Sequence, residues 1–169
     1  MLEIEVKILE IDKNKTIQKI ESLGAQKVFD GIIFAVYFDL PDNKLSAEKK
    51  TLRLRQKGNL AEITLKENVP NDKAKIMDEY ESPCEFNSMR EILNHLGYKE
   101  TRTIKKHRIS YSYNKVHFEI DSYDGIPPLL EIEAPTLAKL EETVCGLGYT
   151  MQDTKPWGAK DVLAYYKKK

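Results

Sequence analysis

The chain has 169 residues with 27 basic and 27 acidic side chains, so its formal net charge is zero. A length in this range predicts one domain with a hydrophobic core of its own. The balanced charge provides no field that would draw the chain to nucleic acid or to an anionic membrane, and no apolar stretch reaches the ~18 residues that a membrane-spanning helix needs. We therefore expect residues 1–169 to form a single domain with neither nucleic acid nor a membrane as its partner.

Cysteine content and the N-terminus bear on the cellular compartment. The two cysteines, Cys84 and Cys145, are too few for a disulfide framework, and no CxxC motif or Cys/His cluster predicts a zinc site. The N-terminal sequence is acidic from Glu3 onward and lacks the basic start and apolar run of a signal peptide. These features predict free thiols in a reducing compartment and hence a cytoplasmic protein.

The first predicted strand covers residues 2–8, where apolar and charged side chains alternate; its charged positions are Glu3, Glu5 and Lys7. Alternation with a period of two predicts a strand with one apolar and one charged face. Apolar residues at helical spacing follow Asp12, and Gly24 comes directly after them. This pattern predicts a helix that stops at the glycine.

This strand–helix unit recurs twice. The segment Glu79-Tyr80-Glu81 precedes Ser88-Met89-Arg90-Glu91, which predicts a capping box and a helix that ends at Gly97. The segment Glu131-Ile132-Glu133 precedes Thr136, a predicted N-cap, and a helix that ends at Gly148. The recurrence indicates a repeated structural unit, with chance in a Glu-rich chain as the alternative.

The segments between these units predict antiparallel hairpins. Residues 51–56 and 61–66 both alternate and are joined through Gly58, and residues 104–113 and 116–121 flank a turn. Further strands are predicted at 32–39 and 129–134, residues 68–75 are expected to form a loop or hairpin end, and a short helix is predicted near residues 162–166. The result is an α+β fold with about eight strands and three or four helices.

Two architectures fit the charged face of these strands. In an open sheet, that face is simply solvated; in a barrel, it lines the inside while helices cover the outside. Patterning alone favours the open sheet. The charges are nevertheless sorted by sign, because Arg53 and Arg55 share one strand whereas Glu131 and Glu133 share another.

This sorting points to a particular chemistry. Carboxylates at positions i and i+2 lie ~6.5–7 Å apart on one strand face, and two such pairs facing each other would offer oxygen ligands to a hard cation, Mg²⁺ or Mn²⁺. Arginine binds phosphate oxygens bidentately. A metal site combined with a basic clamp is what phosphoryl transfer needs.

The N-terminal segment Glu3-Ile4-Glu5-Val6-Lys7 resembles the E-x-E-x-K signature of the CYTH, or triphosphate tunnel metalloenzyme, superfamily. This superfamily includes class IV adenylate cyclases, thiamine triphosphatases and inorganic triphosphatases. One such motif is unspecific, but further matching segments follow in order along nearly the whole chain. They are Tyr37-Phe38-Asp39, Leu52-Arg53-Leu54-Arg55, Thr64-Leu65-Lys66, Lys105-Lys106-His107-Arg108, Ile120-Asp121 and Leu130-Glu131-Ile132-Glu133.

The resemblance implies an eight-stranded antiparallel β-barrel with a charged tunnel and peripheral helices, which decides against the open sheet. It implies that a divalent metal ion is held by the carboxylates Glu3, Glu5, Asp121, Glu131 and Glu133. It implies that a triphosphate is bound by the basic side chains Lys7, Arg53, Arg55, Lys66, Lys106 and Arg108, with Lys160 as a looser match. The candidate catalytic residues are Glu3, Glu5, Lys7 and Tyr37; Tyr37 would activate or position water, with packing near Phe34 and Phe38 as its alternative role.

The implied reaction is Mg²⁺- or Mn²⁺-dependent hydrolysis of an inorganic or small organic triphosphate, with tripolyphosphate, ATP and thiamine triphosphate as candidate substrates. One alternative is a class IV adenylate cyclase, which converts ATP to cyclic AMP and pyrophosphate; another is a non-catalytic polyphosphate-binding module. Trp157 would either stack on a base or thiazole ring or pack beneath the C-terminal helix. A homodimer is compatible with the sequence, but no apolar stripe requires one.

Overall fold

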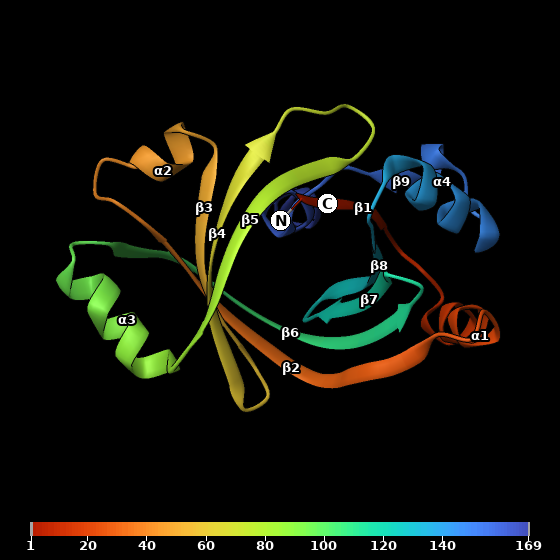
Figure 1. The fold of residues 1–169 in the computed structure, drawn as a ribbon, viewed down its shortest axis with the longest axis horizontal. Coiled ribbons are helices and arrows are strands. Elements are labelled where there is room, and N and C mark those ends of the chain that lie inside the picture. The colour runs from red at the N-terminus through yellow and green to blue at the C-terminus, as the bar shows by residue number, and fades with distance from the viewer. Residues whose placement is uncertain (1, 169) are drawn as a thin grey trace. The chain divides into compact units, whose positions relative to one another are not determined.

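The computed structural model describes residues 2–168 (Figure 1). The strands are β1 (Leu2–Ile8), β2 (Gln26–Asp39), β3 (Lys50–Lys57), β4 (Leu60–Val69), β5 (Lys75–Cys84), β6 (Lys99–Tyr113), β7 (Val116–Tyr123), β8 (Ile126–Ala134) and β9 (Thr154–Lys155). The helices are α1 (Lys13–Ser22), α2 (Lys44–Ala47), α3 (Phe86–His95), α4 (Leu137–Gly146) and α5 (Ala159–Lys167), with a 3₁₀ turn η1 (Met151–Asp153). Within the described residues, no helix has the length and apolar character needed to cross a membrane.

The strands form one sheet in the order β5-β4-β3-β2-β6-β7-β8-β1-β9, and β5 also pairs with β1. This additional pairing closes the first eight strands into a barrel, to which the short β9 is added along β1. The pairs β1–β8, β2–β3, β3–β4, β6–β7 and β7–β8 are antiparallel. The predicted α+β fold with an antiparallel barrel is therefore confirmed, and the open sheet that patterning favours is wrong. Closure satisfies strand edges that an open sheet would leave unpaired.

The chain divides into two compact units, each with an apolar core. Of the described residues, the first unit comprises 31–69 and 77–106, and the second comprises 2–30, 70–76 and 107–168. The expectation that residues 1–169 form a single domain stays a prediction.

The core of the second unit forms on the apolar faces of β1, β7 and β8. Its buried side chains include Val6, Phe118, Ile120, Ile132 and, from α4, Leu140. Helices α1 and α4 begin and end where the sequence predicts. Asp12 accepts a hydrogen bond from the Lys15 N–H at 3.1 Å to cap α1, Thr136 accepts one from the Lys139 N–H at 3.1 Å to cap α4, and both helices are followed by a glycine with positive φ.

The core of the first unit combines β2, β3 and α3; its buried side chains are Val36, Phe38, Leu52, Leu54, Phe86 and Leu93. The predicted capping box at Ser88 is wrong. The Glu85 carboxylate accepts the N–H groups of Asn87 at 3.1 Å and Ser88 at 2.6 Å, so Glu85 is the N-cap and α3 begins at Phe86. A glutamate in this position satisfies the first free helix amides before the predicted Ser88 cap is reached.

Several strands are longer than predicted, and β2 and β6 gain the most residues at their starts. Strand β2 begins at Gln26 rather than Ile32, and β6 begins at Lys99 rather than Ile104. Most residues of both extensions are exposed. A segment that is exposed on both faces does not need the alternation of apolar and polar residues from which a strand is predicted. Strand β5 begins at Lys75, which shortens the predicted loop and places Lys75 on a strand.

Candidate functional site

The second unit carries a group of charged residues on the strand faces opposite its apolar core. We call these residues the acid cluster; its carboxylates are Glu3, Glu5, Glu119, Asp121, Glu131 and Glu133, and its cations are Lys7, Lys75 and Arg108. The strand register places Glu5 opposite Glu133 and places Glu131 between Lys7 and Glu119. Side chains at such opposite positions have Cβ atoms about 4.5–5.5 Å apart, so carboxylates from different strands are direct neighbours.

The acid cluster is buried rather than solvated. The relative exposure is 3% for Glu5, 2% for Lys7, 4% for Arg108 and 0% for Asp121. These values exclude the interpretation of a merely solvated charged face in this unit. Buried charges are costly unless they are paired, so each cation of the cluster needs carboxylate partners within it.

Lys7 links two strands through their carboxylates. Its Nζ lies 3.0 Å from Glu5 Oε1 and 2.6 Å from Glu131 Oε2. Burial would lower the pKa of Lys7, but the charges of Glu131 and Glu5 outweigh burial and raise it above its ordinary value. Lys7 therefore remains an ammonium ion at neutral pH. A second ammonium, Lys75 Nζ, donates to the same Glu5 oxygen at 2.7 Å.

Arg108 joins the remaining carboxylates. Its guanidinium binds Asp121 bidentately at 2.6 and 2.7 Å, contacts Glu119 and lies 3.5 Å from Glu131. Burial would lower the pKa of Arg108, but Asp121 and Glu131 raise it above its ordinary value. Tyr123 lies in the same surroundings, and burial together with the charge of Asp121 raises the pKa of its phenol.

The donor set fits the divalent metal ion that the resemblance implies. Carboxylate oxygens are the ligands that Mg²⁺ and Mn²⁺ prefer, and the register supplies them as the opposite pairs Glu5/Glu133 and Glu119/Glu131. Over residues 2–168, however, no three His, Cys, Asp or Glu side chains are grouped so as to hold an ion. Instead, the carboxylates of Glu5, Glu131 and Asp121 form ion pairs with the cations of the acid cluster. The metal ligands therefore stay a prediction.

The first unit carries the other group of candidate residues. We call it the basic cluster; it comprises the cations Arg53, Arg55, Lys66, Arg102 and Lys106, the carboxylates Glu62, Glu79 and Glu81, and Tyr37. The register places Arg53 between Tyr37 and Thr64 and places Arg55 opposite Glu62. The structure thus brings the predicted residues of β2, β3 and β4 onto adjacent positions.

Several ion pairs of the basic cluster are long. Arg53 lies 3.3 Å from Thr64 Oγ1, 3.6 Å from Glu62 and 3.9 Å from Glu79. Its buried Nε makes no hydrogen bond within the described part of the chain. Lys66 lies 3.3 Å from Glu79, whereas Arg55 makes a close contact with Glu62. A buried guanidinium nitrogen without an acceptor is a group that an anion would satisfy.

Tyr37 belongs to the basic cluster rather than to the apolar core. The guanidinium carbon of Arg102 lies 3.9 Å from the centre of its ring. Burial would raise the pKa of Tyr37, but the positive charges of Arg53, Lys106 and Arg102 lower it below its usual value. Phe34 pairs with Phe86 on the apolar side instead. The arrangement is compatible with a role for Tyr37 toward a ligand, which stays a prediction.

Two further residues from the sequence motifs, Lys160 and Asp39, are not members of either cluster. Lys160 is exposed in the first turn of α5. Asp39, from the Tyr37-Phe38-Asp39 segment, accepts the N–H groups of Leu45 at 2.9 Å and Ser46 at 3.0 Å, so it holds the short helix α2 in place.

Sequence reasoning missed Lys75, Arg102 and Tyr123. Lys75 falls in the predicted loop 68–75, Arg102 precedes the predicted start of its strand, and Tyr123 follows a predicted strand end. Every second residue of a strand lies on the same face. Extending the charged faces that carry Glu79 and Lys106 toward the N-terminus therefore leads to Lys75 and Arg102. The register shift between Asp121 and Tyr123 has no comparable sequence signal.

Comparisons with known proteins agree with this geometry. Residues 1–145 match the family model of the CYTH domain. A Methanocaldococcus jannaschii protein named "Putative adenylate cyclase MJ0240" is 29% identical over 134 residues, which cover 79% of this chain and 77% of that protein. The solved structure of the PH1012 protein from Pyrococcus horikoshii OT3 is 27% identical, with a TM-score of 0.80 over 95% of this chain and 98% of that chain.

A more distant structure shares the fold. It is a Hippeastrum protein described as "Putative adenylyl cyclase HpAC1" with a dominant triphosphatase activity. It is 13% identical, with a TM-score of 0.67 over 99% of this chain and 96% of that chain.

Proposed function

The chain belongs to the CYTH domain family, and we propose that it is a divalent-metal-dependent triphosphatase acting on inorganic or small organic triphosphates. The observation that carries the proposal is the sorting of charge between the two clusters. The acid cluster combines six carboxylates with three cations, whereas the basic cluster combines five cations with three carboxylates. One cluster has an excess of metal-ligand oxygens, and the other has an excess of phosphate-binding groups.

In this proposal the acid cluster holds Mg²⁺ or Mn²⁺ through the carboxylates Glu3, Glu5, Asp121, Glu131 and Glu133. A bound divalent ion supplies Lewis acidity and lowers the pKa of a water ligand. Lys7 holds Glu5 and Glu131 in position through its two ion pairs. Arg108 orients both oxygens of Asp121.

The basic cluster binds the phosphate groups. A triphosphate carries roughly four negative charges at neutral pH, which cationic side chains neutralise in phosphoryl-transfer sites. Arg53, Arg55, Lys66 and Lys106 are the proposed binding residues, and the long contacts of Arg53 leave it able to turn toward an anion. Tyr37 is the proposed group that positions the attacking water. The surrounding cations lower the pKa of its phenol.

The name of the archaeal relative favours a second candidate, a class IV adenylate cyclase. Cyclisation of ATP would need recognition of the nucleobase. Trp157, the tryptophan that the sequence offers for stacking, packs against Tyr165 with ring centres 5.3 Å apart. This contact fits the packing role of Trp157 beneath the C-terminal helix. The carboxylate excess of the acid cluster argues against a non-catalytic polyphosphate binder, which needs only the cations.

Product analysis by phosphorus NMR tests the proposal. The purified protein is incubated with tripolyphosphate, and separately with ATP, in the presence of Mg²⁺, of Mn²⁺ or of a chelator. We expect orthophosphate and pyrophosphate from tripolyphosphate, with either metal and not with the chelator. Cyclic AMP and pyrophosphate from ATP would establish the cyclase instead. A shifted tripolyphosphate signal without any product would favour the binding module.

A further inference from the structure

Two ammonium groups share one oxygen of a predicted metal ligand. Glu5 Oε1 accepts from Lys7 Nζ at 3.0 Å and from Lys75 Nζ at 2.7 Å. A metal ion that binds this oxygen must replace at least one of them, because an ammonium and a divalent cation repel each other at such distances. The two lysines differ in how firmly they are held.

Lys7 and Arg108 cannot leave the acid cluster easily. The Lys7 side chain is 3% exposed and also lies 2.6 Å from Glu131 Oε2, so it keeps a partner if Glu5 is taken away. Arg108 is bound to Asp121 by two hydrogen bonds and contacts two further carboxylates. Removing either cation would leave buried carboxylates unpaired.

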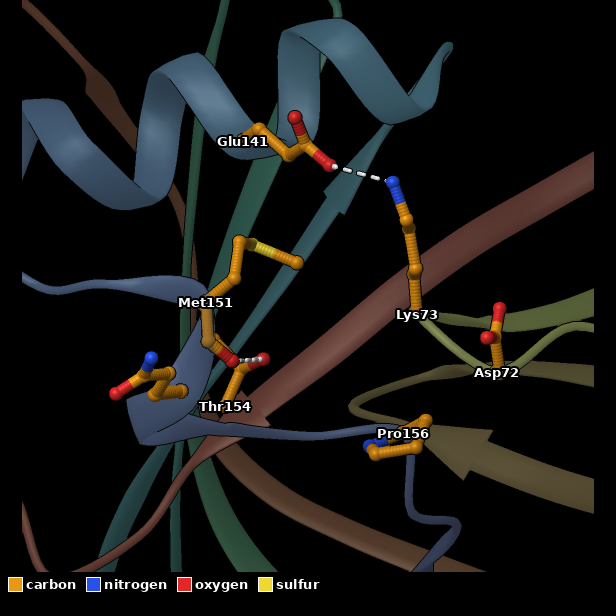
Figure 2. Close-up of a pocket in the computed structure, with 7 residues that line it drawn as sticks. Asp72, Lys73, Glu141, Met151, Thr154 and Pro156 are labelled. Carbon is orange, nitrogen blue, oxygen red and sulfur yellow. Dashed lines mark hydrogen bonds and ion pairs between the residues drawn. The ribbon is translucent and has the colours of Figure 1, made fainter.

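Lys75 lies at the edge of the cluster, and its side chain is 21% exposed. Its backbone, by contrast, is firmly held by the preceding turn. Asn71 Oδ1 accepts the N–H groups of Lys73 at 2.9 Å and Ala74 at 3.0 Å, and Ala74 is buried. In Figure 2, Lys73 of this turn reaches Glu141 of α4 beside a cavity of about 320 Å³. The side chain of Lys75 can therefore leave Glu5 without rearrangement of the loop.

A new partner lies within reach of a displaced Lys75. A Cβ placed on Gly158 would lie 3.7 Å from Lys75 Cε and 3.5 Å from Asp161 Oδ2. The Lys75 chain and the Asp161 carboxylate are thus neighbours at the start of α5. Rotation about the flexible lysine side chain would carry its ammonium from Glu5 toward Asp161.

We propose that Lys75 is an exchangeable internal cation: it neutralises Glu5 in the metal-free protein and is displaced toward Asp161 when a divalent ion binds the acid cluster. This inference rests on the proposed function, since it assumes that the acid cluster is the metal site. It assigns to Lys75 a role in setting metal affinity, separate from phosphate binding.

Titration of the metal-free protein with Mn²⁺, followed by the electron paramagnetic resonance signal of the free ion, tests this role without substrate. Lys75→Met and Lys75→Gln remove the competing charge, and we expect both to bind Mn²⁺ about tenfold more tightly than the wild type. Lys75→Arg keeps the charge and should show no gain. Lys73→Met, in the same turn, is the matched control and should bind like the wild type.

A second measurement uses the wild-type protein and does not depend on any variant. Acetic anhydride labels exposed amines, and mass spectrometry reports the labelling of each lysine. We expect Mn²⁺ to increase labelling of Lys75 at least threefold relative to Lys73, because displacement exposes its amine. Labelling of Lys75 that does not change with Mn²⁺ would overturn the inference.

The outcomes separate this inference from the proposed function. If the wild type hydrolyses tripolyphosphate with Mn²⁺ but the neutral Lys75 variants bind the ion no more tightly, the inference is wrong and the function stands. Weaker tripolyphosphate binding with unchanged Mn²⁺ affinity would make Lys75 a phosphate ligand, which also overturns it. A wild type that binds no Mn²⁺ would overturn both.

Discussion

The cations of the two clusters differ in how closely carboxylates hold them. In the acid cluster, Lys7, Lys75 and Arg108 each have a carboxylate oxygen within 2.7 Å. In the basic cluster, Arg53 reaches Glu62 and Glu79 only at 3.6 and 3.9 Å. Similar strand patterns thus give cations of two kinds. Those of the acid cluster neutralise buried carboxylates. In the basic cluster, Arg55 also contacts Glu62 closely, so Arg53 is the cation whose carboxylate contacts are long.

The burial of the arginine side chains also differs between the two clusters. The side chain of Arg108 is 5% exposed, compared with 13% for Arg53 and 19% for Arg55. A charge that is almost fully desolvated must be paired within the protein, whereas a partly exposed one can exchange a weak internal partner for a ligand. The comparison predicts that removal of Arg108 mainly lowers stability, whereas removal of Arg53 or Arg55 mainly weakens anion binding.

The largest effect is expected for stability in the acid cluster. Arg108→Ala would leave Asp121, Glu119 and Glu131 without their shared cation, and we expect a loss of about 3–5 kcal/mol in the free energy of unfolding. Urea denaturation measures this loss. Arg53→Ala is the comparison variant and should lose less than about 1.5 kcal/mol. Equal losses would show that the two clusters do not differ in this way.

Turnover should depend on the acid cluster. Glu131→Gln keeps the shape of the side chain but removes a charged oxygen donor, and we expect the rate of tripolyphosphate hydrolysis to fall by about 100-fold or more. Tripolyphosphate affinity should change by no more than about threefold, because the cations proposed to bind phosphate remain. The exposed Glu142→Gln on α4 is the control for rate. Unchanged hydrolysis by Glu131→Gln would contradict the assignment.

Asp39 shows that a carboxylate of the first unit can be purely structural. It accepts hydrogen bonds from Leu45, Ser46 and the Ser46 hydroxyl, so Asp39→Asn should cost about 2 kcal/mol near neutral pH. Burial would raise the pKa of Asp39, but the hydrogen bonds from Ser46 and its neighbours lower it below the ordinary value.

The sign of the pH dependence follows from this lowered pKa. The stability that ionised Asp39 supplies is complete above its pKa in the unfolded chain and is lost as the pH falls through its folded value. Urea denaturation between neutral and acidic pH should therefore show the difference between wild type and Asp39→Asn shrinking on acidification. A difference that grows would contradict the role of the ionised carboxylate.

The smallest expected effect concerns anion affinity in the basic cluster. Arg53→Ala and Arg55→Ala should each weaken tripolyphosphate binding about tenfold at low salt, which calorimetry measures in the absence of metal. The loss should diminish as salt rises, because part of the attraction is screened. Arg90→Ala removes an arginine paired with Glu100 on the surface and is the matched control. Equal weakening by Arg90→Ala would indicate a diffuse effect of net charge.

Much of the local structure is predictable from the sequence because it depends on neighbouring residues. The alternation of Glu3, Glu5 and Lys7 with apolar residues predicts β1, and Thr136 and Gly148 predict where α4 begins and ends. Closure of the barrel depends on the pairing of β5 with β1, which local patterning does not encode. The resemblance, rather than periodicity, separates the barrel from the open sheet.

The remaining site residues were missed for physical reasons. Lys75 falls in the predicted loop because residues 68–75 are mostly polar. Arg102 lies in the exposed extension of β6, where apolar residues do not mark the strand. The ion pairs themselves depend on register between distant strands, such as Glu5 opposite Glu133, and a single sequence does not supply that register.

We propose that the acid cluster binds the metal ion and the basic cluster binds the phosphate groups. The most direct test is the Mn²⁺ affinity, without triphosphate, of the wild type, Glu131→Gln and Arg53→Ala. Electron paramagnetic resonance of free Mn²⁺ measures this affinity. We expect Glu131→Gln to bind the ion about tenfold or more weakly and Arg53→Ala to bind within about twofold of the wild type. Normal binding by Glu131→Gln, or equal weakening in both variants, would contradict the assignment of the metal site to the acid cluster.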